Sequence, residues 1–264
     1  MSQGLRIMRH AAAQGLAEFR LVYTWKTWLS GWLLRLLTQV AFFALIGRLL
    51  GSLAEMRYIV VGNAVALITL EAMVVIASSA WERQQGTLPL LVAAPAGHAL
   101  VYLGRGVQWL VTGMVSATTA LVLLPFLLGV PLPWPRALAA FPVLALVGVS
   151  SYCLGCFLAS VVLRFLALQW LILNLGYLVP MTIGGVNVPV AFWPPWVQAV
   201  ANALPLTHGL RAVRLLLAGA PAGLVWRQLV AEAAVGACWL LLALISLDRL
   251  AEHGRRDGSI EFAG

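Results

Sequence analysis

The sequence predicts an all-α integral membrane protein that crosses the bilayer six times. Of its 264 residues, 62% are hydrophobic and only 10% are charged, whereas a soluble domain carries about 25% charged residues. Three long stretches contain no Asp, Glu, Lys or Arg: 106–135, 137–163 and 165–210. Each stretch exceeds the roughly 20 apolar residues that one helix needs to span a bilayer. A chain this apolar cannot cover a water-facing surface, which excludes a soluble enzyme.

Residues 1–27 are expected to form a short cytoplasmic tail followed by an interfacial helix. Leu16, Phe19 and Tyr23 recur at helical spacing among charged residues, which is typical of a helix that lies in the membrane interface. Trp25 would then lie at the depth of the lipid headgroups. The alternative is a cytoplasmic extension of the first span.

A transmembrane domain is expected at 28–250, followed by a cytoplasmic tail at 251–264. We place its six spans at 29–50, 58–80, 99–129, 137–163, 165–187 and 225–247. The third span is longer than one crossing requires, and tilt or a bend at Pro125 would absorb the excess. The stretch 188–224 is apolar, but its five prolines forbid a single straight span. Short re-entrant or interfacial helices are therefore expected there.

The distribution of basic residues favours cytoplasmic termini. An even number of spans puts both termini on one side of the membrane, and cytoplasmic segments carry an excess of Lys and Arg. With the termini inside, ten basic residues fall in inner segments and five in outer ones. Arginine makes up 16 of the 17 basic residues, a bias that indicates a GC-rich bacterial genome. The sequence therefore predicts a multi-pass protein of a bacterial plasma membrane.

Sequence motifs for catalysis are missing from the chain. A phosphate-binding loop, G-x-x-x-x-G-K-[ST], needs a glycine before its lysine, and the single lysine, Lys26, follows a tryptophan. No H-E-x-x-H motif occurs, and the four histidines are scattered outside the spans or at their edges. Ser150 and Ser151 have no histidine opposite them for intramembrane proteolysis. We expect no catalytic residue, no metal site and no cofactor in this chain.

The loop between spans two and three, residues 81–97, predicts a short apolar helix on the cytoplasmic side. Glu82 and Arg83 mark the exit from lipid. Gly86 permits a sharp turn, and Thr87 is a favourable N-cap residue.

The predicted loop helix ends before Pro95, because proline disfavours the helical conformation at the residue before it. Leu88, Leu90 and Leu91 give this helix apolar side chains. Leucines exposed on a soluble loop need a partner surface. The alternative is a simple loop that packs on its own bundle.

Two motifs resemble those of ABC-2 type transporter permeases, the transmembrane subunits of ABC exporters. The first is the family's signature loop after the second span, here Glu82-x-x-x-Gly86-Thr87-x-x-x-Leu91-x-x-x-Pro95. The second is the family's N-P-L-T-x-x-x-x-x-R stretch between spans five and six, here Asn202-Ala203-Leu204-Pro205-Leu206-Thr207-His208-Gly209-Leu210-Arg211. It departs from the family pattern by two residues inserted between Asn and Pro.

The resemblance implies a permease that forms a dimer, usually a homodimer, with two copies of a separate ATPase subunit that binds ATP and Mg. In such permeases the helix of the first cytoplasmic loop is a coupling helix that enters a groove on the ATPase. By this resemblance, leucines 88, 90 and 91 would fill the groove, and Glu82 and Arg83 would make ionic contacts at its rim. The outer gate would include Asn202, Pro205, Leu206, Thr207 and Arg211.

Charged residues within the predicted spans are further candidates for function, because a charge there costs about 2.5–3.5 kcal/mol. Glu71 in span two and Arg35 in span one both lie in the inner half, where they can pair. One interpretation is a structural ion pair or an arginine that snorkels, and the other is a polar lining of the substrate pathway. Glu232, near the outer end of span six, is expected to be interfacial.

A stripe of small residues, Ser151, Gly155 and Ala159, recurs every four residues in span four. Small side chains let helix backbones approach closely. The stripe is expected to pack against a span of the same subunit, with a dimer contact as the alternative.

The function that we predict is export driven by a partner ATPase, with a drug, antibiotic or other amphipathic natural product as substrate. Drug efflux and antibiotic resistance would follow from that substrate class. Lipid-linked glycans, peptides and ions are alternative substrates, because the family transports all of these. Alternatives from other classes are a secondary transporter, a membrane scaffold without transport and an intramembrane enzyme.

Overall fold

The chain folds as a bundle of helices. The computed structural model describes residues 3–49, 52–86 and 98–257, and no strand occurs within these ranges. Six helical segments in them are long and apolar enough to cross a membrane, which confirms the predicted fold class. They are Trp25–Leu49, Leu53–Gln84, Val101–Leu128, Trp134–Arg164, Leu166–Ile183 and Ala222–Leu250.

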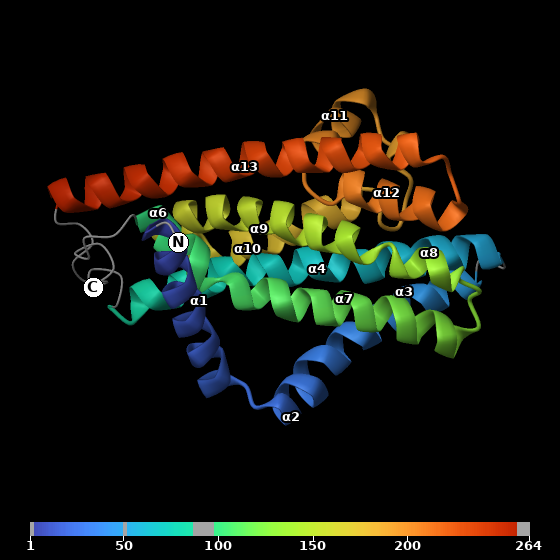
Figure 1. Ribbon diagram of the computed structural model, residues 1–264, viewed down its shortest axis with the longest axis horizontal. Coiled ribbons are helices and arrows are strands. Elements are labelled where there is room, and N and C mark those ends of the chain that lie inside the picture. Colours follow the sequence, from blue (N-terminus) through green and yellow to red (C-terminus); the bar gives the residue numbers. More distant parts are fainter. Residues whose placement is uncertain (1–2, 50–51, 87–97, 258–264) are drawn as a thin grey trace.

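The N-terminal helix α1 (Gln3–Val22) runs across the axis of the bundle instead of along it (Figure 1). It begins at Gln3 and so includes most of the segment expected as a tail. The helix then ends. Thr24 caps the next short helix, α2 (Trp25–Thr27), by accepting a hydrogen bond from the Thr27 backbone N–H at 3.3 Å. This break favours an interfacial helix over a continuous extension of the first span.

The first span changes its helical winding near its start. After α2, residues Trp28–Leu33 form the π-helical segment η1, and α3 (Leu34–Leu49) continues as a regular α-helix. Segments of π-helix are rare and frequently mark functional positions. Here the altered winding contains Trp32, whose indole contacts the buried carboxylate described below.

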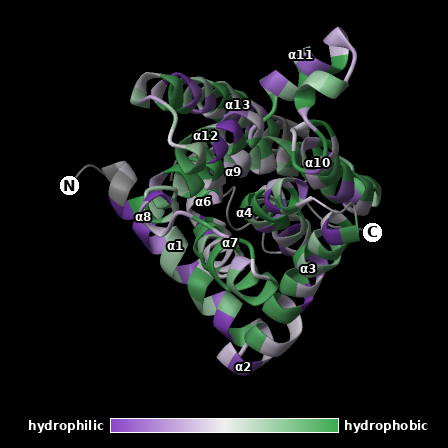
Figure 2. Cartoon of the chain, turned by 90° about the vertical axis from the view of Figure 1, so that its right-hand side faces the viewer, coloured by the Kyte–Doolittle hydropathy of each residue, from purple (hydrophilic) through white to green (hydrophobic). Residues whose placement is uncertain are grey.

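Helix α4 (Leu53–Gln84) is the central element of the bundle (Figures 1 and 2). It packs against α3, against α7 (Val107–Leu128), against α9 (Phe141–Arg164) and against α10 (Gln169–Ile183). Its side chains from Val60 to Ile68 are all buried, without the polar face of an amphipathic helix. A helix with apolar residues on every side belongs in an interior. Helices α3, α7, α9 and α10 surround α4, while α13 (Ala222–Asp257) packs against α9.

The third span is broken at Gly106, which separates α6 (His98–Arg105) from α7. A side chain at Gly106 would overlap the Tyr152 hydroxyl and lie 2.8 Å from Val75 Cγ2. The Tyr152 hydroxyl also donates a hydrogen bond to the Leu103 carbonyl at 2.9 Å, beside the break. Pro125 lies inside α7, which continues to Leu128. The third span is therefore interrupted at Gly106, where two helices approach too closely for any side chain, and Pro125 does not end α7.

The fourth span consists of the short helix α8 (Trp134–Leu138) and α9. Its small residues face α4. The Ser151 hydroxyl lies 2.9 Å from the Thr69 hydroxyl, and a Cβ at Gly155 would lie 2.8 Å from Val75 Cγ1. The prediction that this stripe packs within one subunit is confirmed.

The stretch between spans five and six forms short helices, as predicted. After η2 (Leu166–Leu168) and α10 come η3 (Val190–Phe192), α11 (Pro195–Ala203) and α12 (Thr207–Ala218). Helix α12 packs against α13 (Ala222–Asp257) and α9 at one end of the bundle. The start of α1 and the end of α13 both lie at the opposite end of the bundle (Figure 1).

Candidate functional site

The segment that is predicted to contact an ATPase follows a sharp turn at the end of α4. Helix α4 ends at Gln84, and Gly86 adopts a left-handed conformation with φ = +71°. This is the sharp turn predicted there, because glycine adopts positive φ without steric cost. The predicted coupling-helix residues Thr87, Leu88, Leu90, Leu91 and Pro95 lie outside the described residues. The candidate site is therefore the base of this loop.

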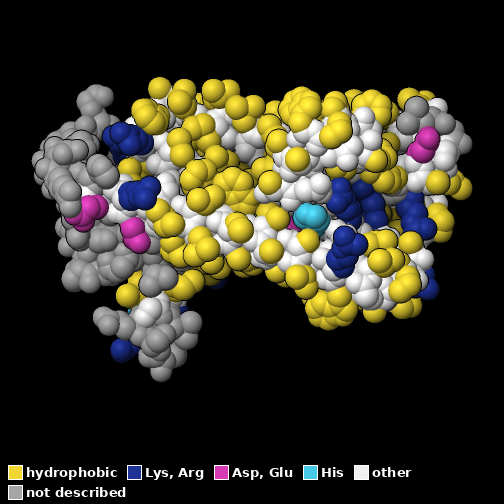
Figure 3. Space-filling model, turned by 90° about the horizontal axis from the view of Figure 1, so that it is seen from above, with side chains coloured by type: hydrophobic (Ala, Val, Ile, Leu, Met, Phe, Trp, Pro, Cys, Tyr) yellow, Lys and Arg dark blue, Asp and Glu magenta, His cyan; other side chains and the backbone are white. Residues whose placement is uncertain are grey.

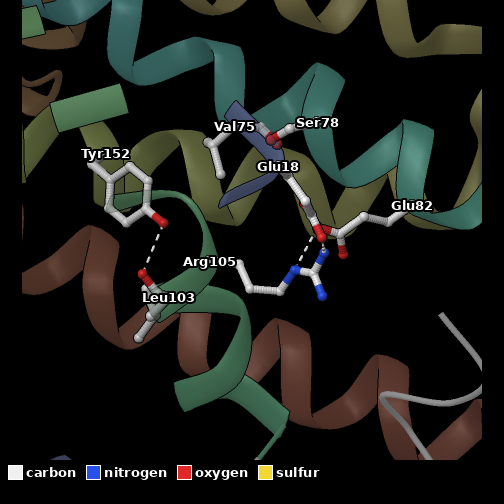
Figure 4. Close-up of polar contacts among 7 residues, drawn as sticks. All are labelled: Glu18, Val75, Ser78, Glu82, Leu103, Arg105 and Tyr152. Carbon is white, nitrogen blue, oxygen red and sulfur yellow. Dashed lines mark hydrogen bonds and ion pairs between the residues drawn. The ribbon is translucent and has the colours of Figure 1, made fainter. Parts of the chain in front are cut away.

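Arg105 joins three helices at the base of the loop (Figure 4). Its guanidinium forms an ion pair with Glu18 of α1, with Nη2 2.6 Å from Oε1, and another with Glu82 of α4, with Nε 2.7 Å from Oε1. The side chains of Arg105 and Glu82 are only 11% and 12% exposed, whereas that of Glu18 is 54% exposed. The pair with Glu82 is therefore the one shielded from water, and the pair with Glu18 is the exposed one. We call Glu18, Glu82 and Arg105 the charge clamp.

Arg83 and Gln84 hold the same end of α4 from its other side. Arg83 donates a hydrogen bond to the Leu163 carbonyl at the end of α9. The Gln84 side-chain amide donates to the Gln169 side-chain oxygen at 3.4 Å, at the start of α10. Glu82 and Arg83, which were expected at the rim of an ATPase groove, thus have partners within the chain, and a role in ATPase contact stays a prediction.

Helix α1 approaches α6 so closely that only small residues fit between them. A Cβ at Gly104 would lie 2.7 Å from Ala11 Cβ, and a Cβ at Gly15 would overlap the Arg105 carbonyl. Close packing of this kind transmits displacement, because a packed interior is nearly incompressible. A movement of α6 therefore carries α1 with it.

Sequence reasoning did not find the charge clamp. Glu18 and Arg105 are 87 positions apart and belong to no motif. The sequence offers only a weak signal for this cluster, since each of the two is a charged residue beside an apolar segment that predicts a helix.

Glu71 lies in a polar cluster between η1, α4 and α7. Its carboxylate accepts hydrogen bonds from Trp32 Nε1 at 2.8 Å, from the Ser116 hydroxyl at 2.9 Å and from the Thr112 hydroxyl at 3.0 Å. Glu71 itself has 0% exposure. Three neutral donors thus satisfy this carboxylate, which a buried charge requires.

The predicted ion pair between Glu71 and Arg35 does not form. Arg35 is exposed and stacks on the Trp32 ring, with its guanidinium carbon 5.3 Å from the ring centre. Trp32 therefore contacts both charged residues, donating to Glu71 and stacking under Arg35. The roles of both in a substrate pathway stay predictions.

Glu71→Gln is expected to leave the protein folded, with a free energy of unfolding within about 1 kcal/mol of wild type. The glutamine oxygen can accept from Trp32 and Ser116, and its amide can donate to the Thr112 hydroxyl, which can also act as an acceptor. Glu71→Ala removes the acceptor from all three donors and is expected to destabilise by several times as much. The loss of monodisperse protein on heating measures both variants. If Glu71→Gln unfolds as readily as Glu71→Ala, the hydrogen-bond assignment is wrong.

The residues of the second motif, from Asn202 to Arg211, contact one another at the other end of the bundle. Arg211 donates a hydrogen bond to the Asn202 side-chain oxygen at 2.9 Å. His208 lies 3.1 Å from the Asn202 carbonyl and 2.9 Å from the Gln228 side-chain oxygen of α13. The two inserted residues therefore do not separate the asparagine of this motif from its arginine.

Glu232 holds the start of α12. Its carboxylate accepts the Leu206 N–H at 3.0 Å, the Gly209 N–H at 2.9 Å and the Ser150 hydroxyl. Its exposure is 0%, so the prediction of an interfacial position is wrong. The physical reason is that the first N–H groups of a helix lack partners within the helix and attract negative charge. Leu206 adopts φ = +86°, which is strained for leucine and persists only where surrounding contacts enforce it.

Arg214 fastens α12 to the start of α4 and to the loop after α10. Its guanidinium stacks on the Tyr58 ring at 3.4 Å and donates to the carbonyls of Gly185 at 2.6 Å and Val186 at 3.0 Å. Burial lowers the pKa of Arg214 to about 10, so this side chain remains charged at neutral pH. Figure 3 shows basic side chains gathered beside a histidine at this end, while apolar side chains cover much of the same face.

One comparison with known proteins identifies a family. A family model described as ABC-2 type transporter matches residues 14–217. The matched range includes the charge clamp, the loop after α4 and the motif from Asn202 to Arg211, but not Glu232. No curated protein matches the chain significantly.

Proposed function

This chain belongs to the ABC-2 type transporter family, and on that premise we propose that it is the membrane half of an exporter driven by a separate ATPase. Two copies of the chain would form the pathway, and two ATPase subunits would bind ATP and Mg. The chain itself is a transport permease and a multi-pass membrane protein. Its substrate would be a drug, antibiotic or other amphipathic natural product.

The charge clamp is the observation that carries the proposed coupling. The segment from 87 to 97 connects α4 to α6, and Arg105 joins the end of α4 to α6 and to α1. A force applied to this segment would therefore reach three helices together. When an ATPase closes on ATP, it can shift the transporter only through contacts that differ between the open and the closed ATPase. A rigid connection must then carry that change from the contacts to the helices.

A narrow gap between α3 and α10 supports a pathway at the contact of two copies. Gln39, Asn63 and Tyr177 line this gap on α3, α4 and α10 respectively. Polar residues within a membrane line substrate paths more often than they line lipid-facing surfaces. Gln39 and Tyr177, which are only half-buried, are better candidates for the pathway than Glu71 and Asn63, which are enclosed within one copy.

We propose that α1 and the loop after α4 face the cytoplasm. The start of α1 and the end of α13 both lie at this end of the bundle (Figure 1). Basic residues that flank the spans are more numerous here, in agreement with the positive-inside rule. Asn202, Pro205, Leu206, Thr207 and Arg211 would then form the outer gate.

Reconstitution into liposomes with its ATPase tests the proposal. We expect uptake of a fluorescent amphipathic compound into inside-out vesicles only when the chain, the ATPase and hydrolysable ATP are all present. Uptake by the chain alone under an ion gradient would instead indicate a secondary transporter. A stable complex without any transport would indicate a scaffold.

A further inference from the structure

A groove of about 830 Å³ lies between the start of α9 and the start of α13, at the end of the bundle that contains α12. Its volume is within the roughly 300–1,000 Å³ typical of sites for small molecules. Val143 on α9 and Leu229 on α13 line opposite walls, and Ala233 lies at the exposed edge. Figure 2 places α8 on the opposite side of α4 from α3 and α10. The groove therefore faces lipid and not the proposed contact between two copies.

Arg136 is the one charged residue among those that line this groove, all of which belong to the described ranges. Its guanidinium lies against Gly219, where a Cβ would come within 2.6–2.8 Å of it. Among the described residues, the structure gives no ion pair between a carboxylate and Arg136. An exposed cation at the mouth of an apolar groove is complementary to a ligand that has an anionic group at one end and an apolar part that enters the groove.

We propose that this groove binds an anionic phospholipid, with an acyl chain between α9 and α13 and the phosphate at Arg136. The apolar walls match an acyl chain, and the guanidinium matches a phosphate. Trp134 and Trp226 are 43% and 65% exposed near the same end, which is typical of the depth where headgroups meet hydrocarbon. A phosphate at that depth is within reach of Arg136.

Native mass spectrometry of the purified chain tests this site. The protein is mixed with equal amounts of phosphatidylglycerol and phosphatidylcholine that carry the same acyl chains. We expect wild type to retain phosphatidylglycerol about five-fold more than phosphatidylcholine, the ratio typical of one arginine at an anionic lipid surface. Arg136→Gln is expected to bring that ratio close to one.

Two matched controls separate the groove from the general charge and surface of the protein. Arg227→Gln removes an exposed arginine of α13 that does not line the groove and should keep the wild-type ratio. Ala233→Trp fills the groove and should reduce retention of both lipids. Ala237→Trp, one helical turn further on and also exposed, should not.

The proposal is overturned if Arg136→Gln keeps the wild-type ratio, or if Arg227→Gln lowers it equally. Equal lipid retention by Ala233→Trp and Ala237→Trp would also overturn it. None of these measurements needs an ATPase or a transport substrate, so their outcome is independent of the proposed transport function.

Discussion

Neutralising the buried half of the charge clamp is expected to lower transport per ATP hydrolysed by roughly 5–150-fold, the range of typical coupling energies. The variant is Glu82→Gln with Arg105→Gln, which removes both charges of the buried pair together. Removing Arg105 alone would leave Glu82 without its ionic partner, which destabilises proteins by about 3–5 kcal/mol. The paired variant should therefore fold, while α4 is no longer joined by an ion pair to α6 and to the α1 that packs against α6. Transport and ATP hydrolysis are measured on the same proteoliposomes.

Two further variants define what the clamp contributes. Arg20→Gln changes an exposed arginine of α1 for which the structure gives no ion pair, so it should transport like wild type. Exchanging the two charges, Glu82→Arg with Arg105→Glu, keeps the attraction between α4 and α6 and should recover part of the coupling. If the neutral pair transports normally, the clamp is structural and force reaches the spans by another route.

Glu232→Gln is expected to destabilise the protein by about 1–3 kcal/mol, the cost of one buried polar group without a partner. The carboxylate accepts backbone N–H groups on both oxygens, from Leu206 on one and from Gly209 on the other. A glutamine can place its oxygen at only one of them, and its NH₂ group would then face the other N–H. Backbone donors cannot reverse their role as a hydroxyl can.

The matched control is Glu71→Gln, which makes the same chemical change at a buried carboxylate in the same bundle. Its amide can face a hydroxyl, so it should unfold close to wild type, whereas Glu232→Gln should unfold at clearly lower temperature. Equal melting temperatures for the two variants would show that Glu232 does not hold α12 through these bonds.

The spans were predictable because the bilayer imposes a strong constraint on sequence. Backbone groups in lipid must pair within a helix, so an uncharged stretch such as 165–210 already indicates spanning structure. The five prolines of 188–224 likewise indicated short helices instead of a seventh crossing. These predictions need only composition and local breakers, which a single sequence displays.

Contacts between distant residues were not predictable from the sequence. The partner of Glu71 was expected to be Arg35, because opposite charges at similar depth attract, but the rotation of α3 turns Arg35 outward and Trp32 inward. Glu232 was placed at the interface because its sequence position lies near the end of a span. That reasoning could not include α12, which folds back and presents unpaired N–H groups to the carboxylate.

The position of the break in the third span was also not predictable from the sequence. Pro125 carries a known local effect on helices, whereas Gly106 acts only through its neighbours Tyr152 and Val75. A glycine that is required by close packing looks like any other glycine in a sequence.

The most direct test of the central claim is photocrosslinking from the segment after Gly86. A photoreactive amino acid at Leu91, in the chain assembled with its ATPase, should form a covalent adduct with the ATPase, and the yield should change between ATP-bound and nucleotide-free states. The same probe at Leu241, which is exposed on α13, should not form this adduct. Transport that is driven by ATP and shows no adduct at Leu91 in either nucleotide state would contradict the account.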